Sequence, residues 1–202
     1  MRRPSEIREA PSGESLKSPS ARAAVRIQAG KWKGRRLEVP ETARPTSGRA
    51  RAALFDLLGP ERIAYARVLD LFAGSGAVGL EAVSRGAAAA VLVDADANAV
   101  ANTCARIGAA PGEVRVVSGD AGAAVVALAR EAERFDLIFA DPPYGKDPGR
   151  AMDGAAALLA AGGVLIVQSD AGEAVLAPAG LKPLSRRDYG RNVFHFFGIP
   201  LT

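Results

Sequence analysis

The chain has 202 residues, 49% of them hydrophobic, which fits one well-buried domain and leaves little room for two. Cys104 is the only cysteine, which excludes an internal disulfide and favours a reducing compartment, so we expect a cytoplasmic protein. No apolar stretch is long enough to span a bilayer, and residues 1–24 lack the apolar segment of a secretory signal.

The positive charge is concentrated near the N-terminus. The net charge is +4, but residues 26–51 alone carry +6, from eight basic and two acidic side chains, and residues 1–25 add +2. The remainder of the chain therefore carries a net charge of −4. A basic segment on an acidic body favours a polyanionic partner, although arginines scattered over a solvated surface would give the same count.

Two segments precede the first expected helix. Residues 1–24 are rich in Ser, Pro, Arg and Glu without an apolar period, which predicts a disordered tail. Residues 25–39 alternate loosely around Gly30 and Gly34, a pattern that predicts a short β-ribbon. The basic side chains of this ribbon are expected to be exposed.

A helix is expected next, with Thr46 or Ser47 as its cap. It should run to about residue 58, because Gly59 and Pro60 follow as a stop signal. Its apolar stripe is expected to pack onto the main body. The predicted stripe comprises Ala53, Leu54, Leu57 and Leu58.

From Arg67 onward, short apolar runs alternate with alanine-rich stretches, the pattern of a parallel sheet covered by helices on both faces. Expected strands are residues 68–72, 90–94, 114–117, 137–140, 163–168, 181–186 and 193–197. Expected helices are residues 77–84, 97–107, 121–132 and 151–159, with a short fifth at 173–176. The last two strands should form an antiparallel pair that turns at Tyr189 and Gly190.

A glycine-rich turn follows the first of these strands. Residues 74–79 match the pattern GxGxxG, and Asp94 lies twenty positions after Gly74. This spacing also occurs in dinucleotide-binding dehydrogenases, where an acid binds the ribose. A nicotinamide oxidoreductase is therefore one interpretation of the loop.

Acidic residues near the ends of successive strands favour S-adenosylmethionine over a pyrophosphate. Asp70 would attract a cationic head group and repel a pyrophosphate, and Asp94 can accept from a ribose diol. Asp120 can accept from an adenine amino group, although capping the next helix explains it equally well. The predicted cofactor contacts are Asp70, Phe72, Gly74, Gly76, Asp94, Asp120 and Ala121.

The tetrapeptide Asp141-Pro142-Pro143-Tyr144 follows the fourth strand directly. The prolines fix the backbone, so the Asp141 carboxylate and the Pro142 carbonyl can accept the two hydrogens of a planar amine. Tyr144 can stack on the base that carries the amine. Asp141, Pro142 and Tyr144 are therefore the predicted catalytic residues. The alternative, a strand that simply ends in a proline turn, explains the two prolines but not the flanking Asp141 and Tyr144.

Taken together, these motifs resemble the class I S-adenosylmethionine-dependent methyltransferases that modify exocyclic amines of bases. Residues 26–37, 44–46 and 53–55 are similar to the N-terminal element of the bacterial 16S rRNA guanine(966)-N2 methyltransferases. So are residues 72–76 and 79–82. The resemblance runs from about residue 26 to the end of the chain.

The resemblance implies an α/β fold, a Rossmann-like seven-stranded sheet with its last strand antiparallel, and methylation of guanine N2 in small-subunit rRNA. It divides the chain into a tail at 1–24, a basic RNA-binding extension at 25–60 and a methyltransferase domain at 61–202. We expect a monomer that needs no metal or membrane and binds 16S rRNA or a partly assembled small subunit. The residues predicted to contact RNA are Arg26, Lys31, Trp32, Lys33, Arg35, Arg36, Arg44, Thr46, Arg49 and Arg191.

The chain departs from the family pattern at three places. Residues 48–52 read Gly-Arg-Ala-Arg-Ala where two acids are usual, and Asp94 stands where Glu is common but keeps its ribose role. Gln168 stands where an acid is common and is assigned no role. Three alternatives also stay open: an adenine-N6 methyltransferase acting on DNA or RNA, an oxidoreductase, and an RNA-binding module without catalysis. The motif at residues 141–144 serves adenine N6 as readily as guanine N2.

Overall fold

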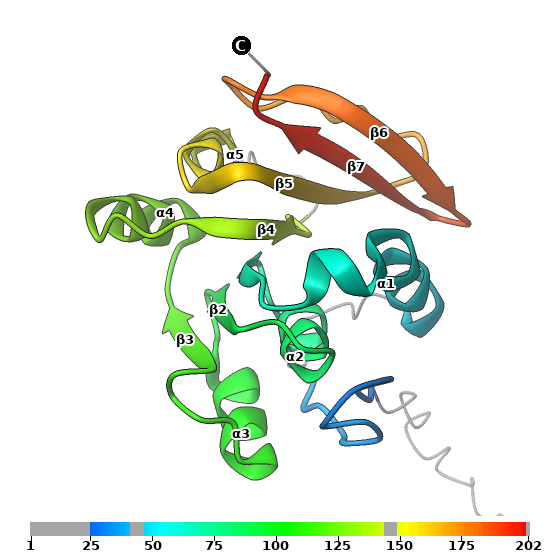
Figure 1. The fold of residues 1–202 in the computed structure, drawn as a ribbon, viewed down its shortest axis with the longest axis vertical. Coiled ribbons are helices and arrows are strands. Elements are labelled where there is room, and N and C mark those ends of the chain that lie inside the picture. The colour runs from blue at the N-terminus through cyan, green and yellow to red at the C-terminus, as the bar shows by residue number, and fades with distance from the viewer. Residues whose placement is uncertain (1–24, 41–46, 144–148, 201–202) are drawn as a thin grey trace, which may run out of the picture.

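The computed structural model describes residues 25–40, 47–143 and 149–200, so the predicted tail at 1–24 lies outside it. A seven-stranded sheet has the order β3-β2-β1-β4-β5-β7-β6 (Figure 1). β7 is antiparallel to both of its neighbours, and the other pairings are parallel, as predicted. The strands are β1 (Arg67–Leu71), β2 (Ala89–Asp94), β3 (Val114–Ser118), β4 (Phe135–Ala140), β5 (Leu159–Asp170), β6 (Lys182–Tyr189) and β7 (Asn192–Gly198).

Five helices connect and cover the described part of the sheet. They are α1 (Gly48–Ile63), α2 (Ala77–Ser84), α3 (Asn98–Ile107), α4 (Ala121–Arg130) and α5 (Gly149–Ala156). The short helix predicted at 173–176 is wrong, because these residues follow a turn without helical structure. α5 also ends earlier than predicted, since Leu159 already pairs with Phe135 in the sheet. None of the helices in the described ranges has the length and apolar character needed to cross a membrane.

Alternation along the strands produces two cores, because successive side chains point to opposite faces. The first core packs α1, α2 and α3 against one face, which includes Val68, Leu92, Leu137, Phe139 and Ile166. The second core packs α4 and α5 against the other face, which includes Leu69, Val93, Ile138, Ala140 and Val167. The continuous apolar runs of the sequence are thus explained by burial on both sides.

The first helix differs from its prediction in length and in phase. Ser47 caps it as expected, with its Oγ accepting from the Ala50 N–H at 3.1 Å. Gly59, with a φ of 69°, kinks the helix without ending it, and the helical residues continue to Ile63. The buried stripe is shifted, so that Leu57 is 39% exposed. Its members are Ala50, Arg51, Leu54, Phe55, Leu58 and Ile63.

The basic segment of residues 25–39 is a loop in which the predicted β-ribbon is reduced to one antiparallel bridge, flanked by backbone hydrogen bonds from Ile27 N–H to the Arg35 carbonyl at 3.0 Å and from Leu37 N–H to the Val25 carbonyl at 2.9 Å. Arg26 and Arg36 form one isolated antiparallel bridge, and the chain turns between them. The loop is also held by contacts to α2, including the Lys31 N–H, which donates to the Ser84 carbonyl at 2.8 Å. The loose alternation of the sequence suggested a longer ribbon. The same alternation fits a loop whose apolar residues, Ile27 and Leu37, anchor it to the core.

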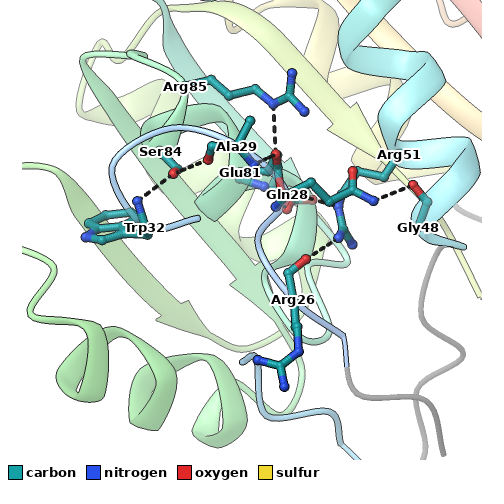
Figure 2. A network of polar contacts seen from close by, with 11 residues as sticks. Arg26, Gln28, Ala29, Trp32, Gly48, Arg51, Glu81, Ser84 and Arg85 are labelled. Atoms are coloured by element: carbon teal, nitrogen blue, oxygen red, sulfur yellow. Dashed lines mark hydrogen bonds and ion pairs between the residues drawn. The ribbon is translucent and has the colours of Figure 1, made fainter. Parts of the chain in front are cut away.

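Glu81 of α2 is the centre of the contacts that attach this loop (Figure 2). Its side chain is fully buried and accepts the backbone N–H groups of Gln28 at 2.7 Å and Ala29 at 3.0 Å. Arg85 donates to it at 2.8 Å, and Arg51 of α1 lies 3.6 Å away. The carboxylate thereby joins the loop, α1 and α2 into one unit on the first-core face of the sheet.

Candidate active site

Polar side chains lie at the carboxyl ends of four adjacent strands, where ligands bind in open α/β sheets. They are Asp94 at the end of β2, Asp70 in β1, Asp141 after β4 and Gln168 in β5. Each follows a first-core residue by two positions, so alternation places all four on the same face as α1, α2 and α3. The sheet therefore gathers three carboxylates and an amide along one edge.

Asp70 is the most buried of these carboxylates, with 5% of its surface exposed. Its Oδ2 accepts the N–H of Gly79 at 2.8 Å, which links the strand to the start of α2. Burial raises the pKa of Asp70 to about 7, and the negative charges of Asp141 and Asp94 contribute to this increase, while the Gly79 hydrogen bond opposes it. A cation bound here would favour the ionised carboxylate.

The glycine turn at residues 74–79 brings α2 close to the sheet. A Cβ on Gly79 would lie 2.1 Å from a methyl group of Leu92, so only glycine permits this approach. Gly76 caps α2 with a φ of 71°, and Phe72 also has a positive φ, of 64°. A residue other than glycine is strained at a positive φ, so the surrounding structure must hold the Phe72 backbone in this conformation.

Asp94 and Asp120 also organise the backbone around the turn. Asp94 accepts from the N–H of Gly74 at 2.7 Å through Oδ2 and from that of Asp96 at 3.0 Å through Oδ1. Asp120 caps α4 by accepting from the Ala123 N–H at 2.9 Å, so its capping role is confirmed. The Ala121 side chain is buried in the second core. Cofactor contacts by these residues stay predictions.

Asp141 and Pro142 follow β4 at the same edge, with Asp141 exposed and Pro142 half-buried. Tyr144, the third predicted catalytic residue, lies outside the described residues. Asp141 is close enough to Asp70 to raise its pKa. Sequence reasoning missed Gln168, whose Nε2 donates to Asp141 Oδ2 at 3.2 Å. The signal available was its position, two residues after Ile166 in the buried part of β5.

The donor and acceptor groups at this edge fit S-adenosylmethionine. The ligand carries a positive sulfur and an ammonium, and the carboxylates of Asp70 and Asp141 lie close enough together to offer both groups a counter-charge. Asp94 lies beside the glycine turn, where its oxygens can also accept from a ribose diol. A pyrophosphate would meet the same negative charges, which argues against a nicotinamide dinucleotide.

Most of the residues predicted to bind RNA are exposed. Arg44 and Thr46 lie outside the described residues. The exposed residues are Arg26, Lys31, Lys33, Arg35, Arg36, Arg49 and Arg191. Lys31 forms an ion pair with Glu113. The loop that carries most of them packs on α2, on the same face of the sheet as the acidic side chains.

Trp32 is a correction to the prediction, because it is buried and not available to stack on a base. It is 8% exposed, belongs to the first core, and donates its backbone N–H to Ser84 Oγ at 2.9 Å. The Lys31 ammonium covers its ring at 4.4 Å. Arg51, which belongs to the basic segment by sequence, is also buried and adds no charge to the surface.

Replacing Trp32 with leucine is expected to affect folding and not RNA recognition. The lost packing should lower the free energy of unfolding by roughly 1–2 kcal/mol. The salt dependence of RNA binding should not change, because no phosphate contact is removed. Chemical denaturation and RNA titration at several salt concentrations check this, and a selective loss of RNA affinity at unchanged stability would contradict the anchoring role.

Comparisons with known proteins agree with this architecture. The model of the family described as Conserved hypothetical protein 95 matches residues 25–198. Ribosomal RNA small subunit methyltransferase D of Escherichia coli is 40% identical over 136 residues, which cover 64% of this chain and 66% of that protein. The protein of the same name from Haemophilus influenzae is 33% identical, over 65% of this chain and 69% of its own length.

Similarity to a solved structure extends over more of the chain. A hypothetical protein of Thermus thermophilus superposes with a TM-score of 0.73 at 37% identity, over 87% of this chain and 99% of that one. A putative methyltransferase of Escherichia coli superposes with a TM-score of 0.69 at 33% identity, over 86% of this chain and 96% of that one. The fold is therefore that of a class I methyltransferase, with the Rossmann-like seven-stranded sheet described above. Because the family model spans nearly the whole described chain, the protein belongs to the Conserved hypothetical protein 95 family.

Proposed function

We propose that the protein transfers a methyl group from S-adenosylmethionine to the exocyclic N2 amine of a guanine in the 16S rRNA of the small ribosomal subunit. The observation that supports this most is the row of carboxylates, Asp94, Asp70 and Asp141, at the ends of three adjacent strands beside the glycine turn. The relatives named small subunit rRNA methyltransferases support the RNA substrate.

The reaction needs orientation more than strong acid or base catalysis. S-adenosylmethionine supplies a methyl group bonded to a positively charged sulfur. The amine nitrogen would bond to the methyl carbon as the carbon–sulfur bond breaks, with the bonding pair staying on sulfur, and one amine proton would pass to water, directly or through the Asp141 carboxylate. Holding the amine in line with the breaking bond converts this step into an effectively unimolecular one, which can remove much of the barrier.

Asp141 and Pro142 are proposed to hold that amine. The Asp141 carboxylate accepts one hydrogen and offsets the positive charge that builds on nitrogen, and the Pro142 carbonyl accepts the other. Tyr144 is proposed to stack on the base once it has left its helix. Asp70 holds the cationic part of the methyl donor, and Asp94 and Asp120 its ribose and adenine. The proposed pocket is completed by Phe72, Gly74, Gly76 and Ala121.

The basic loop at residues 25–39 is proposed to bind phosphates, so the RNA is recognised apart from the chemistry. Residues 25–60 and 61–202 thus act as RNA-binding extension and methyltransferase domain. We propose that the protein works in the cytoplasm, where its rRNA substrate is found, and that it acts as a monomer. The choice of guanine N2 over adenine N6 follows from the family resemblance, because the described side chains present acceptors that suit either amine.

Transfer of a labelled methyl group tests this function. Small subunits and naked 16S rRNA from a strain lacking the enzyme are incubated with the protein and labelled S-adenosylmethionine, and the modified base is mapped by mass spectrometry. Label on guanine N2 of one 16S nucleotide is the expected result, and comparison of the two substrates shows which one is used. Label on adenine, on DNA only, or nowhere contradicts the proposal.

Cofactor affinity is expected to depend on pH through Asp70. Without ligand, the buried carboxyl has a pKa of about 7 and is protonated below that pH. A bound ammonium or sulfonium favours the ionised form, so affinity should increase from pH 6 to about 7.5 and then level off, by at most about tenfold per pH unit. Calorimetric titration with S-adenosylmethionine from pH 6 to 8 measures this. Asp70→Asn should bind weakly with a flat profile, and a flat profile in the wild type contradicts the assignment.

Removing charge from the basic loop is expected to weaken RNA binding in a salt-dependent way. Lys33 and Arg35 are both exposed, and replacing both with glutamine should reduce the slope of log affinity against log salt by about 2. The matched control replaces Arg130 and Arg134, which are exposed near the end of α4 on the opposite face of the sheet. If the control reduces the slope equally, the loop is not the RNA surface.

A further inference from the structure

Gln168 connects the proposed catalytic carboxylate to the last strand of the sheet. Its Nε2 donates to Asp141 Oδ2 at 3.2 Å and to Asn192 Oδ1 at 3.2 Å. The side chain is half-buried near the end of β5, and neither the motifs nor the family resemblance assigned it a role. Side chains following β4, in β5 and at the start of β7 are thereby joined in one chain of hydrogen bonds.

The sheet register makes this arrangement specific. Val167 of β5 pairs with Ala140, the last residue of β4. The residues that follow them, Gln168 and Asp141, therefore lie side by side. On the other side Gln168 pairs with Phe194 of β7, and Asn192 stands two positions earlier on the same face. The amide therefore lies between its two acceptors because of backbone pairing and not because of a flexible loop.

An amide has chemical consequences here that a carboxylate lacks. The two hydrogens of Nε2 satisfy one acceptor each, so the contact to Asn192 fixes which hydrogen faces Asp141. Donation to a carboxylate favours its ionised form and restricts its rotation.

We propose that Gln168 is a positioning residue for methyl transfer, which keeps Asp141 ionised and aligned with the amine while Asn192 holds the Gln168 amide in place. This inference rests on the proposed function of the site. Asp141 needs such support because it already faces Asp70 of β1, and Asp94 of β2 adds negative charge to the same edge. Gln168 from β5 and Asn192 from β7 are neutral, so they support the carboxylate without adding to this charge.

The experiment measures single-turnover methyl transfer to small subunits as a function of pH, with the methyl donor saturating so that the titration of Asp70 does not limit binding. Gln168→Leu removes the donor to Asp141 without adding charge, and it is expected to lower the rate at pH 7 by about tenfold and to shift the acid limb of the profile upward by about one unit. Activity should be partly recovered above pH 8.5, a rescue that a merely structural defect would not show.

Asn192→Ala provides a second test that adds no charge. It leaves Gln168 in place but removes the acceptor that fixes its amide, and it is expected to lower the rate about three- to tenfold with a smaller upward shift of the acid limb. Affinity for S-adenosylhomocysteine and thermal stability should match the wild type in this variant. It also keeps the inference testable if Gln168→Leu does not fold.

Parallel measurements separate this inference from the proposed function. If the wild type transfers no methyl group to small subunits, the proposed function fails. A second outcome is an active wild type with an inactive Asp141→Ala variant. If the pH profiles of both the Gln168 and Asn192 variants then match the wild type, only the positioning role of Gln168 is overturned. Shifted profiles at unchanged cofactor affinity support it.

Discussion

Asp141→Ala is expected to reduce the single-turnover rate of methyl transfer by at least about 10²- to 10³-fold, the range seen when a single charge-stabilising or orienting contact is removed from an active site. The reason is that the amine loses the acceptor that directs its lone pair and offsets its developing charge. Asp141→Asn should be nearly as impaired, because an amide of similar shape supplies no negative charge.

Cofactor binding provides the control for this prediction. Affinity for S-adenosylhomocysteine should stay within about threefold of the wild type, since its sulfur is uncharged and Asp70 remains to hold its ammonium. Asp56→Ala, at an exposed position on α1, should leave both the rate and the affinity unchanged. Turnover by Asp141→Ala close to the wild-type rate would show that the amine is oriented by other groups.

Glu81→Ala is expected to lower the free energy of unfolding by about 3–5 kcal/mol, because it leaves the buried Arg51 without its counter-charge. Arg51 is 1% exposed, and its Nε and Nη1 have no hydrogen-bond partner beyond the ion pair with Glu81. Burial lowers the pKa of Arg51, and Glu81 opposes that shift. The N–H groups of Gln28 and Ala29 also lose their acceptor.

Chemical denaturation measures this change, and hydrogen exchange locates it. Exchange should accelerate first in the loop at residues 25–39, which Figure 2 shows gathered around Glu81. Glu113→Gln is the matched control, because it removes an exposed ion pair with Lys31 of the same loop. That variant should cost less than about 1 kcal/mol. Equal losses in the two variants would mean that burial of the Glu81 network contributes nothing special.

The parts of the fold that could be predicted from sequence are those with a strong local signal. Apolar runs located all seven strands, since a strand buried on both faces has few polar residues. The glycine turn at 74–79 was recognisable from the spacing of its glycines directly after a strand. The structure gives a reason for one of them, because a Cβ on Gly79 would collide with Leu92. Asp70 and Asp141 were identified because they stand at strand ends, where any parallel sheet brings side chains together.

The parts that could not be predicted depend on contacts between distant segments. Arg51 and Glu81 look like surface charges in the sequence, and only the packing of α1 on α2 reveals that they are buried together. Trp32 among basic residues suggested an exposed stacking surface, yet the loop turns its ring into the core. The position of Gln168 near the end of β5 was visible in the sequence, but its contacts were not, because they depend on the register of β5 with both β4 and β7.

A crystal structure with S-adenosylhomocysteine bound tests the central claim most directly. We expect the ligand to lie across the glycine turn, with its amino group near Asp70, its ribose near Asp94 and its sulfur facing the residues that follow β4 (Figure 1). A ligand whose sulfur points away from Asp141, or one bound at another edge of the sheet, would contradict it.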